Sequence, residues 1–220
     1  MSTGAPAARG RRATVVLAAL VLLAAAVLAA LAASRSGGPA EDGPEAGFAR
    51  DMSAHHAQAV RMSFVVRDRT KDPAVRLLAY DIINTQSAQI GMMTAWLDEW
   101  GLPKTDPRGP MRWMSGHGHG GGEAPAPAPS SGGDGAARMP GMATREQLAG
   151  LDRAGGRAAE VLFLRLMIAH HRGGVAMAEA VLARTGHDRV RRLARTMVDG
   201  QNAEIRLMNG MLRERGGAEA

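Results

Sequence analysis

The chain has 220 residues, and its 27 Lys or Arg and 21 Asp or Glu give a formal net charge of +6. It contains no cysteine, which excludes disulfide scaffolds, thiolate zinc sites, iron–sulfur clusters and thiol nucleophiles. Acidic residues are interspersed with the basic ones and aromatic residues are only 3% of the chain, so no nucleic-acid partner is expected. The 14 methionines outnumber the aromatic residues, and this excess needs a reason.

The N-terminus combines basic residues with a long apolar run. Three arginines among residues 9–12 precede an apolar segment from Ala13 to Ala33. A positive region followed by about 20 apolar residues is typical of export signals and of membrane anchors. Residues 1–33 are therefore predicted to be a transmembrane anchor or a long signal peptide, and residues 30–32 offer a cleavage pattern. Both interpretations place the rest of the chain outside the cytoplasm; a buried helix of a cytosolic domain is the alternative.

An internal repeat organises the remainder of the chain. After a short linker of residues 34–44, a shift of 115 positions aligns residues 45–101 with residues 160–216 without a gap. The two segments are identical at 23 of 57 positions. A gapless match of this length indicates that one structural unit has been duplicated.

Each unit is predicted to be a helical hairpin. From about Glu45 to Arg67, apolar residues recur on one face of a helix, and His55 and His56 lie on that same face. Pro73 suits the first turn of a second helix, which is expected to end at Gly101. The second unit repeats this pattern, and no strand pattern competes with it.

The predicted fold class is all-α. Two hairpins, residues 45–101 and 145–220, would bury their apolar stripes against each other in an antiparallel four-helix bundle. The intervening crossover, residues 102–144, is rich in Gly, Pro, Met and His and is expected to be disordered.

Each hairpin is predicted to hold polar residues in one layer of its core. With equal rise per residue on both sides of the turn, His56 faces Gln86, and Met52 is level with Gln89 and Ile90. The corresponding pairs in the second hairpin are His170 and His171 with Gln201, and Met167 with Glu204.

These residue types together favour copper. A single buried histidine or methionine is more often a packing residue, but adjacent core histidines are costly to desolvate, and here the pair occurs twice. Thioethers select copper(I) and imidazole binds either copper state, so copper(I) is favoured over copper(II). Zinc gains little from thioethers, and the predicted core lacks the Glu-x-x-His pairs and carboxylates of a di-iron site.

Two motifs occur in both units, as FARDMSAHHAQAVRM with QSAQIGMM and as FLRLMIAHHRGGVAM with QNAEIRLM. They resemble the bacterial domain-of-unknown-function 305 family. The resemblance implies a ferritin-like helical bundle, and copper binding and tolerance as in some exported members; it implies no enzymatic activity. The family usually carries Glu at the position of Gln89, as this chain does at Glu204. The metal-site positions suggested by the pattern and the resemblance are Met52, His55, His56, Met62, Gln86, Met93, Met167, His170, His171, Met177, Gln201, Glu204 and Met208.

The crossover adds a second group of possible ligands. Its methionines and histidines are Met111, Met114, His117, His119, Met139 and Met142. They are interpreted either as a secondary copper-capturing segment or as incidental residues of a low-complexity linker.

The sequence thus predicts an extracytoplasmic copper-binding protein that sequesters the metal or hands it to a copper-handling partner protein. If the N-terminal helix is not cleaved, it attaches the protein to the membrane. No catalytic constellation is readable, so the chain is not predicted to be an enzyme, and a redox enzyme lacks a recognisable substrate pocket. The alternative is a non-metal, membrane-anchored helical module with a structural or partner-binding role.

Overall fold

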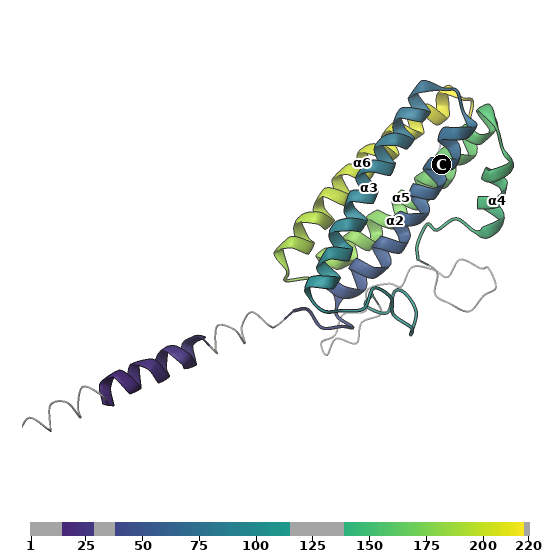
Figure 1. Cartoon of the computed structure of the whole chain (residues 1–220). Helices are drawn as coiled ribbons and strands as arrows, with labels where there is room; N and C mark the ends of the chain where they lie inside the picture. The colour runs from purple at the N-terminus through teal and green to yellow at the C-terminus, as the bar shows by residue number, and fades with distance from the viewer. Residues whose placement is uncertain (1–14, 29–37, 115–138, 218–220) are drawn as a thin grey trace, which may run out of the picture. The chain divides into compact units, whose positions relative to one another are not determined.

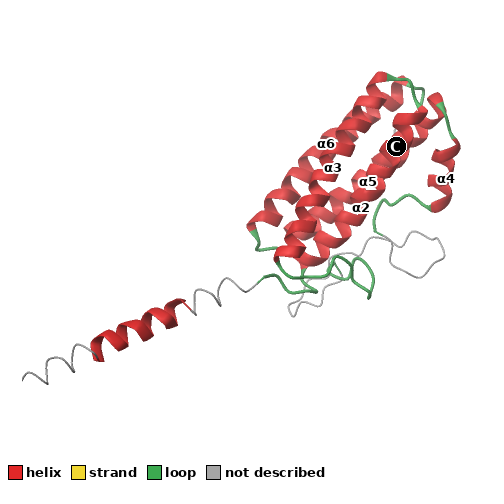
Figure 2. Cartoon of the chain, viewed as in Figure 1, coloured by secondary structure: helices red, strands yellow, loops and turns green. Residues whose placement is uncertain are grey.

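A computed structural model describes residues 15–28, 38–114 and 139–217 of the chain (Figure 1). These residues form helices and loops, and no strand occurs among them (Figure 2). The chain divides into two compact units, Met1–Pro39 and Ala40–Ala220. In the first unit residues 15–28 form a helix with exposed side chains. No helix within the described segments is long and apolar enough to cross a membrane. The predicted anchor or signal lies partly outside these segments and stays a prediction.

The second unit contains five helices among its described residues, which are α2 (Pro44–Arg69), α3 (Pro73–Glu99), α4 (Arg145–Arg153), α5 (Gly156–Leu182) and α6 (Asp188–Glu214). Helix α2 packs against α3, α5 packs against α6, and the two hairpins meet through α2 and α5. The four long helices lie side by side (Figure 1), and we refer to them as the bundle. The predicted all-α fold with paired hairpins is confirmed, whereas the ferritin-like topology stays a prediction.

Local sequence signals set the hairpin ends. The Asp72 carboxylate accepts hydrogen bonds from the backbone N–H groups of Ala74 (2.9 Å) and Val75 (3.0 Å), and Pro73 occupies the first turn of α3. Gly101 and Gly216 follow α3 and α6 with φ of +67° and +68°, the left-handed conformation that ends many helices. These equivalent glycines show that the duplication kept the helix ends as well as the core.

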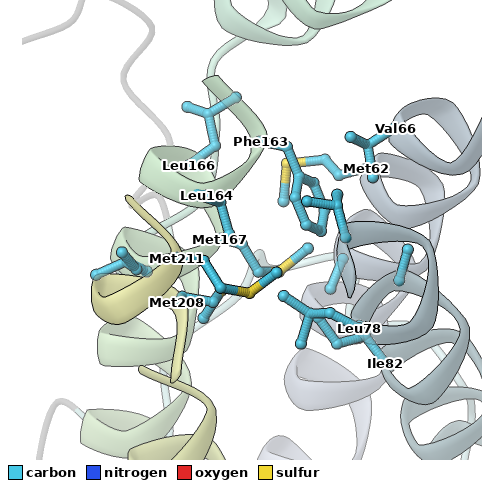
Figure 3. Packing of buried hydrophobic residues seen from close by; sticks show 14 of the residues in the cluster. Met62, Val66, Leu78, Ile82, Phe163, Leu164, Leu166, Met167, Met208 and Met211 are labelled. Atoms are coloured by element: carbon cyan, nitrogen blue, oxygen red, sulfur yellow. The ribbon is translucent and has the colours of Figure 1, made fainter. Parts of the chain in front are cut away.

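The bundle core consists of two apolar clusters, which we name after their phenylalanines. In the Phe163 cluster, Met62 of the first hairpin packs with Met167 and Met208 of the second (Figure 3). In the Phe48 cluster, the equivalent Met177 of the second hairpin packs with Met52 and Met93 of the first. Each cluster therefore needs both hairpins, which explains why a single hairpin would leave its stripe exposed.

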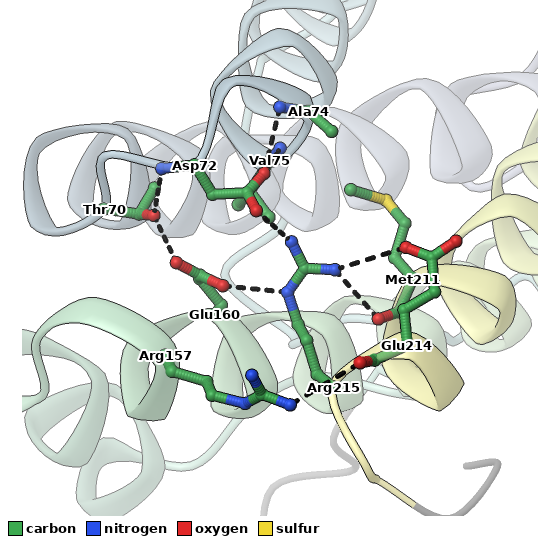
Figure 4. A network of polar contacts seen from close by, with 9 residues as sticks. All are labelled: Thr70, Asp72, Ala74, Val75, Arg157, Glu160, Met211, Glu214 and Arg215. Carbon is green, nitrogen blue, oxygen red and sulfur yellow. Dashed lines mark hydrogen bonds and ion pairs between the residues drawn. The ribbon is translucent and has the colours of Figure 1, made fainter.

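A buried polar network joins the hairpins at the end of the bundle near the Phe163 cluster (Figure 4). The Thr70 hydroxyl donates to Glu160 (2.5 Å), and Arg215 pairs with both Glu160 (2.8 Å) and Asp72 (2.6 Å). Thr70 belongs to the first hairpin, whereas Glu160 and Arg215 belong to the second. The bonds therefore fix how far one hairpin slides along the other.

The prediction that the crossover is disordered is wrong at its two ends. Trp113 is 7% exposed, packs edge-on against Phe48 with 6.0 Å between ring centroids, and donates from Nε1 to the Asp51 carboxylate (2.8 Å). The backbone N–H of Met111 donates to the same oxygen (2.7 Å). At the other end, residues 139–144 lie against α2 and α5, as described below.

The segment assigned to the start of the second hairpin also differs from the prediction. Residues 145–153 form the separate helix α4, which contacts α2 and α5, and the hairpin itself begins at Gly156. A capping box starts α4, because the Thr144 hydroxyl accepts from the N–H of Gln147 and the Gln147 side chain accepts from the N–H of Thr144. The residues of this capping box were the available sequence signal for a separate helix.

Candidate metal centre

Four histidines form a buried layer between the two apolar clusters. His55 and His56 on α2 and His170 and His171 on α5 are each at most 1% exposed. The rings of His55 and His170 contact each other across the α2–α5 interface, with 3.7 Å between centroids and 33° between ring planes. Each of these two rings lies 6.4 Å from its sequence neighbour. The sequence predicted a separate histidine pair in each hairpin. In the structure the two pairs form one continuous row of four rings, which we call the histidine layer.

Each histidine uses the same ring nitrogen for its hydrogen bond. Nε2 of His55 contacts the Pro140 carbonyl oxygen (2.9 Å), and Nε2 of His170 contacts the carbonyl oxygen of His55 (3.0 Å). Nε2 of His56 contacts the Gln89 side-chain oxygen (2.7 Å), and Nε2 of His171 contacts the Glu204 carboxylate (2.5 Å). Because carbonyl and carboxylate oxygens accept, Nε2 carries the proton in each case and donates.

The opposite ring nitrogens carry the lone pairs. The Nδ1 atoms of His55, His56 and His171 are buried and have no hydrogen-bond partner. Buried polar atoms without a protein partner are rare in folded proteins, and many of them contact an ion or a water molecule. A histidine that binds a metal usually donates its other N–H to a carbonyl or carboxylate, as these histidines do.

Burial keeps three of the four histidines in the form that binds metals. Desolvation lowers the pKa of His55 to about 4, although its bond to Pro140 opposes this. Desolvation together with the neighbouring His55 lowers the pKa of His56 to about 3. The pKa of His170 is likewise far below its usual value because the ring is buried. These imidazoles are therefore neutral at pH 7, and no proton competes with a metal for their lone pairs.

The predicted register within each hairpin is wrong by about one helical turn. His56 bonds Gln89 and not Gln86, so Met52 and Met93, four residues before and after that pair, come level with each other. In the second hairpin, His171 bonds Glu204 and not Gln201, which sets Met167 level with Met208. Residues 70–72 form the turn between α2 and α3, close to the predicted turn, so the error lies in the level assigned to each pair across it.

The glutamines predicted to face the histidines lie one turn further along. Neither Gln86 nor Gln201 bonds a histidine. Their side-chain oxygens are buried and have no hydrogen-bond partner. A Cβ at Gly174 would lie 2.4 Å from the Gln201 oxygen, so a larger residue there would make this amide shift. Both amides add an unsatisfied oxygen to the interior near the layer.

The methionines of the motif lie on both sides of the histidine layer. All six are fully buried. Met52, Met93 and Met177 lie in the Phe48 cluster, and Met62, Met167 and Met208 lie in the Phe163 cluster. Within the described segments, no group of three His, Asp or Glu side chains is arranged to hold a metal ion. Thioethers or amide oxygens would have to complete a site that the histidines begin.

A crossover segment for which the sequence predicted no structural role covers the layer. Residues 139–144, the strap, place the Pro140 carbonyl on His55. Gln58 holds the strap through two bonds to the Ala143 backbone, of 3.0 and 2.7 Å. A Cβ at Gly173 would lie 2.0 Å from the Pro140 oxygen, and Gly141, with φ +74°, is similarly close to α5. Two glycines beside the histidine pair were the available signal for this close approach.

Three of the four crossover methionines gather at one end of the bundle. Met111 belongs to the Phe48 cluster, and Met114 and Met139 pack against it, so this cluster is richer in methionine than the Phe163 cluster. Met142 is half-buried within the strap. His117 and His119 lie outside the described residues, and their predicted role stays a prediction.

Comparisons with known proteins agree with the fold. The family model described as "Domain of unknown function (DUF305)" matches residues 45–212. A DUF305 protein from Streptomyces coelicolor, proposed to be secreted, is 48% identical with a TM-score of 0.71, covering 82% of this chain and 99% of its own. A DUF305 fragment from Deinococcus radiodurans is 35% identical with a TM-score of 0.60, covering 78% of this chain and 96% of its own.

Two further proteins are similar to this chain. CopM in its Cu(I)-bound form is 24% identical with a TM-score of 0.54, covering 77% of this chain and 96% of its own, and this likeness concerns the fold. CopM has also been solved with Cu(II) and with silver. Uncharacterized protein L153 of Acanthamoeba polyphaga mimivirus is 42% identical over 52 residues, which are 24% of this chain. The match spans about a third of that relative, 34% of its length.

Proposed function

The chain belongs to the DUF305 family, and on that basis we propose that it is an extracytoplasmic copper-binding protein that uses the histidine layer and its flanking thioethers. The observation that carries the proposal is that the Nδ1 atoms of His55, His56 and His171 are buried and have no hydrogen-bond partner. Their Nε2 atoms are each occupied by an oxygen acceptor, which leaves Nδ1 as the donor atom for a metal.

The donor set favours copper(I) over other metals. Neutral imidazoles and fully buried thioethers are soft or intermediate ligands, which suit copper(I) and require no deprotonation. Zinc and di-iron sites would use thiolates or several carboxylates, and Glu204 is the carboxylate bonded to the layer. CopM, which has a similar fold, has been solved with Cu(I), Cu(II) and silver bound, which supports copper as the metal here.

Export and metal transfer complete the proposal. The basic and apolar N-terminus of residues 1–33 would direct the second unit out of the cytoplasm, as a cleaved signal or as a membrane anchor. The Streptomyces coelicolor relative, proposed to be secreted, supports this location. Outside the cytoplasm the protein would sequester copper or pass it to a copper-handling partner, and it would catalyse no reaction of its own.

An anaerobic titration of copper(I) into the full chain, against a chromophoric competitor, tests the proposal. We expect binding far tighter than the millimolar range, and we expect the His56→Leu/His171→Leu variant to lose most of it. The variant should stay folded, at a cost of about 1–3 kcal/mol for the two orphaned partners, Gln89 and Glu204. Affinity in the millimolar range for the unaltered chain would refute the proposal.

The competing function is a non-metal helical module. It is favoured by the completeness of the packing, since the four histidines are almost fully buried and each donates one hydrogen bond. On this hypothesis the histidines hold the hairpins together, and copper leaves the melting temperature unchanged. Copper binding to the native state would raise it.

A further inference from the structure

The two halves of the histidine layer differ at one equivalent position. Gln89 bonds His56, whereas its repeat mate Glu204 bonds His171, through the same ring nitrogen. Building on the proposed function, we infer that the layer has two unequal half-sites for a monovalent soft ion, with the His171–Glu204 half-site filled first and the His56–Gln89 half-site much weaker. Charge on the hydrogen-bond partner of each histidine, and not ligand type, would set this order.

The remaining surroundings of the two half-sites match closely. Met52 and Met93 lie one turn from His56, and Met167 and Met208 lie one turn from His171. All four methionines are fully buried. Both His56 and His171 have a buried Nδ1 without a partner. The amide-for-carboxylate difference is therefore the main chemical contrast in the immediate surroundings of the two histidines.

A buried cation needs a compensating charge. Neutral imidazoles supply none, so a copper(I) ion in the layer would bring one uncompensated positive charge into an apolar interior. The Glu204 carboxylate can neutralise one such charge through His171. The buried acids among the described residues are engaged elsewhere, since Asp51 accepts from Trp113 and Glu160 pairs with Arg215.

A second bound ion would also be repelled by the first. The His55 and His170 rings, with centroids 3.7 Å apart, connect the two half-sites, so two bound cations would lie in one continuous buried layer. Their repulsion in a medium of low dielectric further weakens the second binding step. The missing carboxylate at Gln89 and the repulsion between the ions both weaken the second binding step, so the two half-sites should fill one after the other.

Exchanging the two residues tests this order. Copper(I) is titrated anaerobically into the unaltered chain, Glu204→Gln and Gln89→Glu, with bound ions counted by native mass spectrometry. The unaltered chain should bind one ion about 10–100-fold more tightly than a second, the range by which a change of a ligand histidine's hydrogen-bond partner alters metal affinity. Glu204→Gln should weaken the first step by a similar factor, and Gln89→Glu should strengthen the second. Thermal melts without copper check that each variant is folded.

The outcomes separate this inference from the function on which it rests. Two equal binding steps in the unaltered chain, or a first step unaffected by Glu204→Gln, would overturn the inference and leave copper binding intact. Absence of copper binding in all three proteins would overturn the proposed function itself. If Gln89→Glu fails to fold, the step pattern of the unaltered chain and of Glu204→Gln decides the question.

Discussion

At the scale of single residues, the hydrogen-bond acceptors around the histidine layer determine its chemistry. Oxygen atoms accept a hydrogen bond from Nε2 of each ring, and burial lowers the pKa values of His55, His56 and His170. The residue types of the layer were predictable, because HH recurs in both repeats within an apolar stripe. Their hydrogen-bond acceptors were not predictable, because a register error of one helical turn assigned Gln86 and Gln201 in place of Gln89 and Glu204. The spacing of residues along the sequence shows which face of a helix a side chain lies on more reliably than it shows which residue of the neighbouring helix lies opposite.

The lowered histidine pKa values predict loss of stability in mild acid. Below about pH 6.5 the unfolded chain takes up protons that the native His55 and His56, with pKa values of about 4 and 3, do not. Unfolding therefore becomes easier by roughly 1.4 kcal/mol per pH unit for each histidine between pH 6.5 and about 4, and stability is full above pH 6.5. Urea denaturation at pH 7 and pH 5 measures this difference.

The control for this effect is His56→Leu. Asp51, whose pKa is raised by burial, changes stability in the opposite direction, but it is present in both proteins. The variant should lose roughly 2 kcal/mol less than the unaltered chain between pH 7 and pH 5. An equal loss in both proteins would show that His56 is not buried and neutral in the native state.

At the scale of elements, the strap depends on a glycine of α5. A methyl group at Gly173 would lie 2.0 Å from the Pro140 oxygen and 2.4 Å from its carbonyl carbon, both backbone atoms that cannot rotate away. Gly173→Ala should therefore displace the strap and destabilise the protein by about 1–3 kcal/mol, the usual cost of overpacking. Thermal or urea denaturation measures the change, and proteolysis within residues 139–144 should become faster.

Gly200→Ala provides the matched control in α6. A Cβ there meets no atom within 4 Å, so the substitution should be neutral or stabilising by about 0.5–1 kcal/mol, through helix propensity alone. Equal effects of Gly173→Ala and Gly200→Ala would mean that the strap does not lie on α5. In repeat numbering Gly173 corresponds to Gln58, which holds the same strap from α2, so the two hairpins diverged to bind one segment.

The other end of the crossover predicts a second effect on stability. Trp113→Ala should cost about 3–5 kcal/mol, because it removes a large buried side chain from the Phe48 cluster and leaves the buried Asp51 carboxylate with one fewer donor. Arg112→Ala, at the exposed neighbouring position, should change stability by less than about 0.5 kcal/mol. Chemical denaturation of both variants measures the contrast, and a cost near zero for Trp113→Ala would show that this residue does not pack on the bundle.

Composition misled the prediction for this element. A Gly- and Pro-rich segment was expected to be disordered because no apolar stripe runs through it. Isolated anchors such as Met111 and Trp113 need no periodicity, since a single large side chain can fill a gap between helices. The same reason explains why the strap was not predicted.

At the scale of the whole molecule, duplication made the fold predictable. The gapless repeat gave two hairpins with the same apolar stripe, and each stripe required a partner. Because the stripes pair, each hairpin places one methionine among residues of the other hairpin. Met62 packs with second-hairpin residues, and Met177 packs with first-hairpin residues. What the repeat could not reveal is its asymmetry, which lies in Glu204, Gly173 and the crossover that covers one face of the layer.

X-ray absorption at the copper edge of the full chain loaded anaerobically with copper(I) tests the central claim most directly. If copper binds within the histidine layer and its flanking methionines, the nearest shell should contain both nitrogen and sulfur. The chain has no cysteine, so any sulfur must come from methionine. A shell of nitrogen and oxygen alone, or a spectrum unchanged by His56→Leu/His171→Leu, would contradict copper binding in the histidine layer.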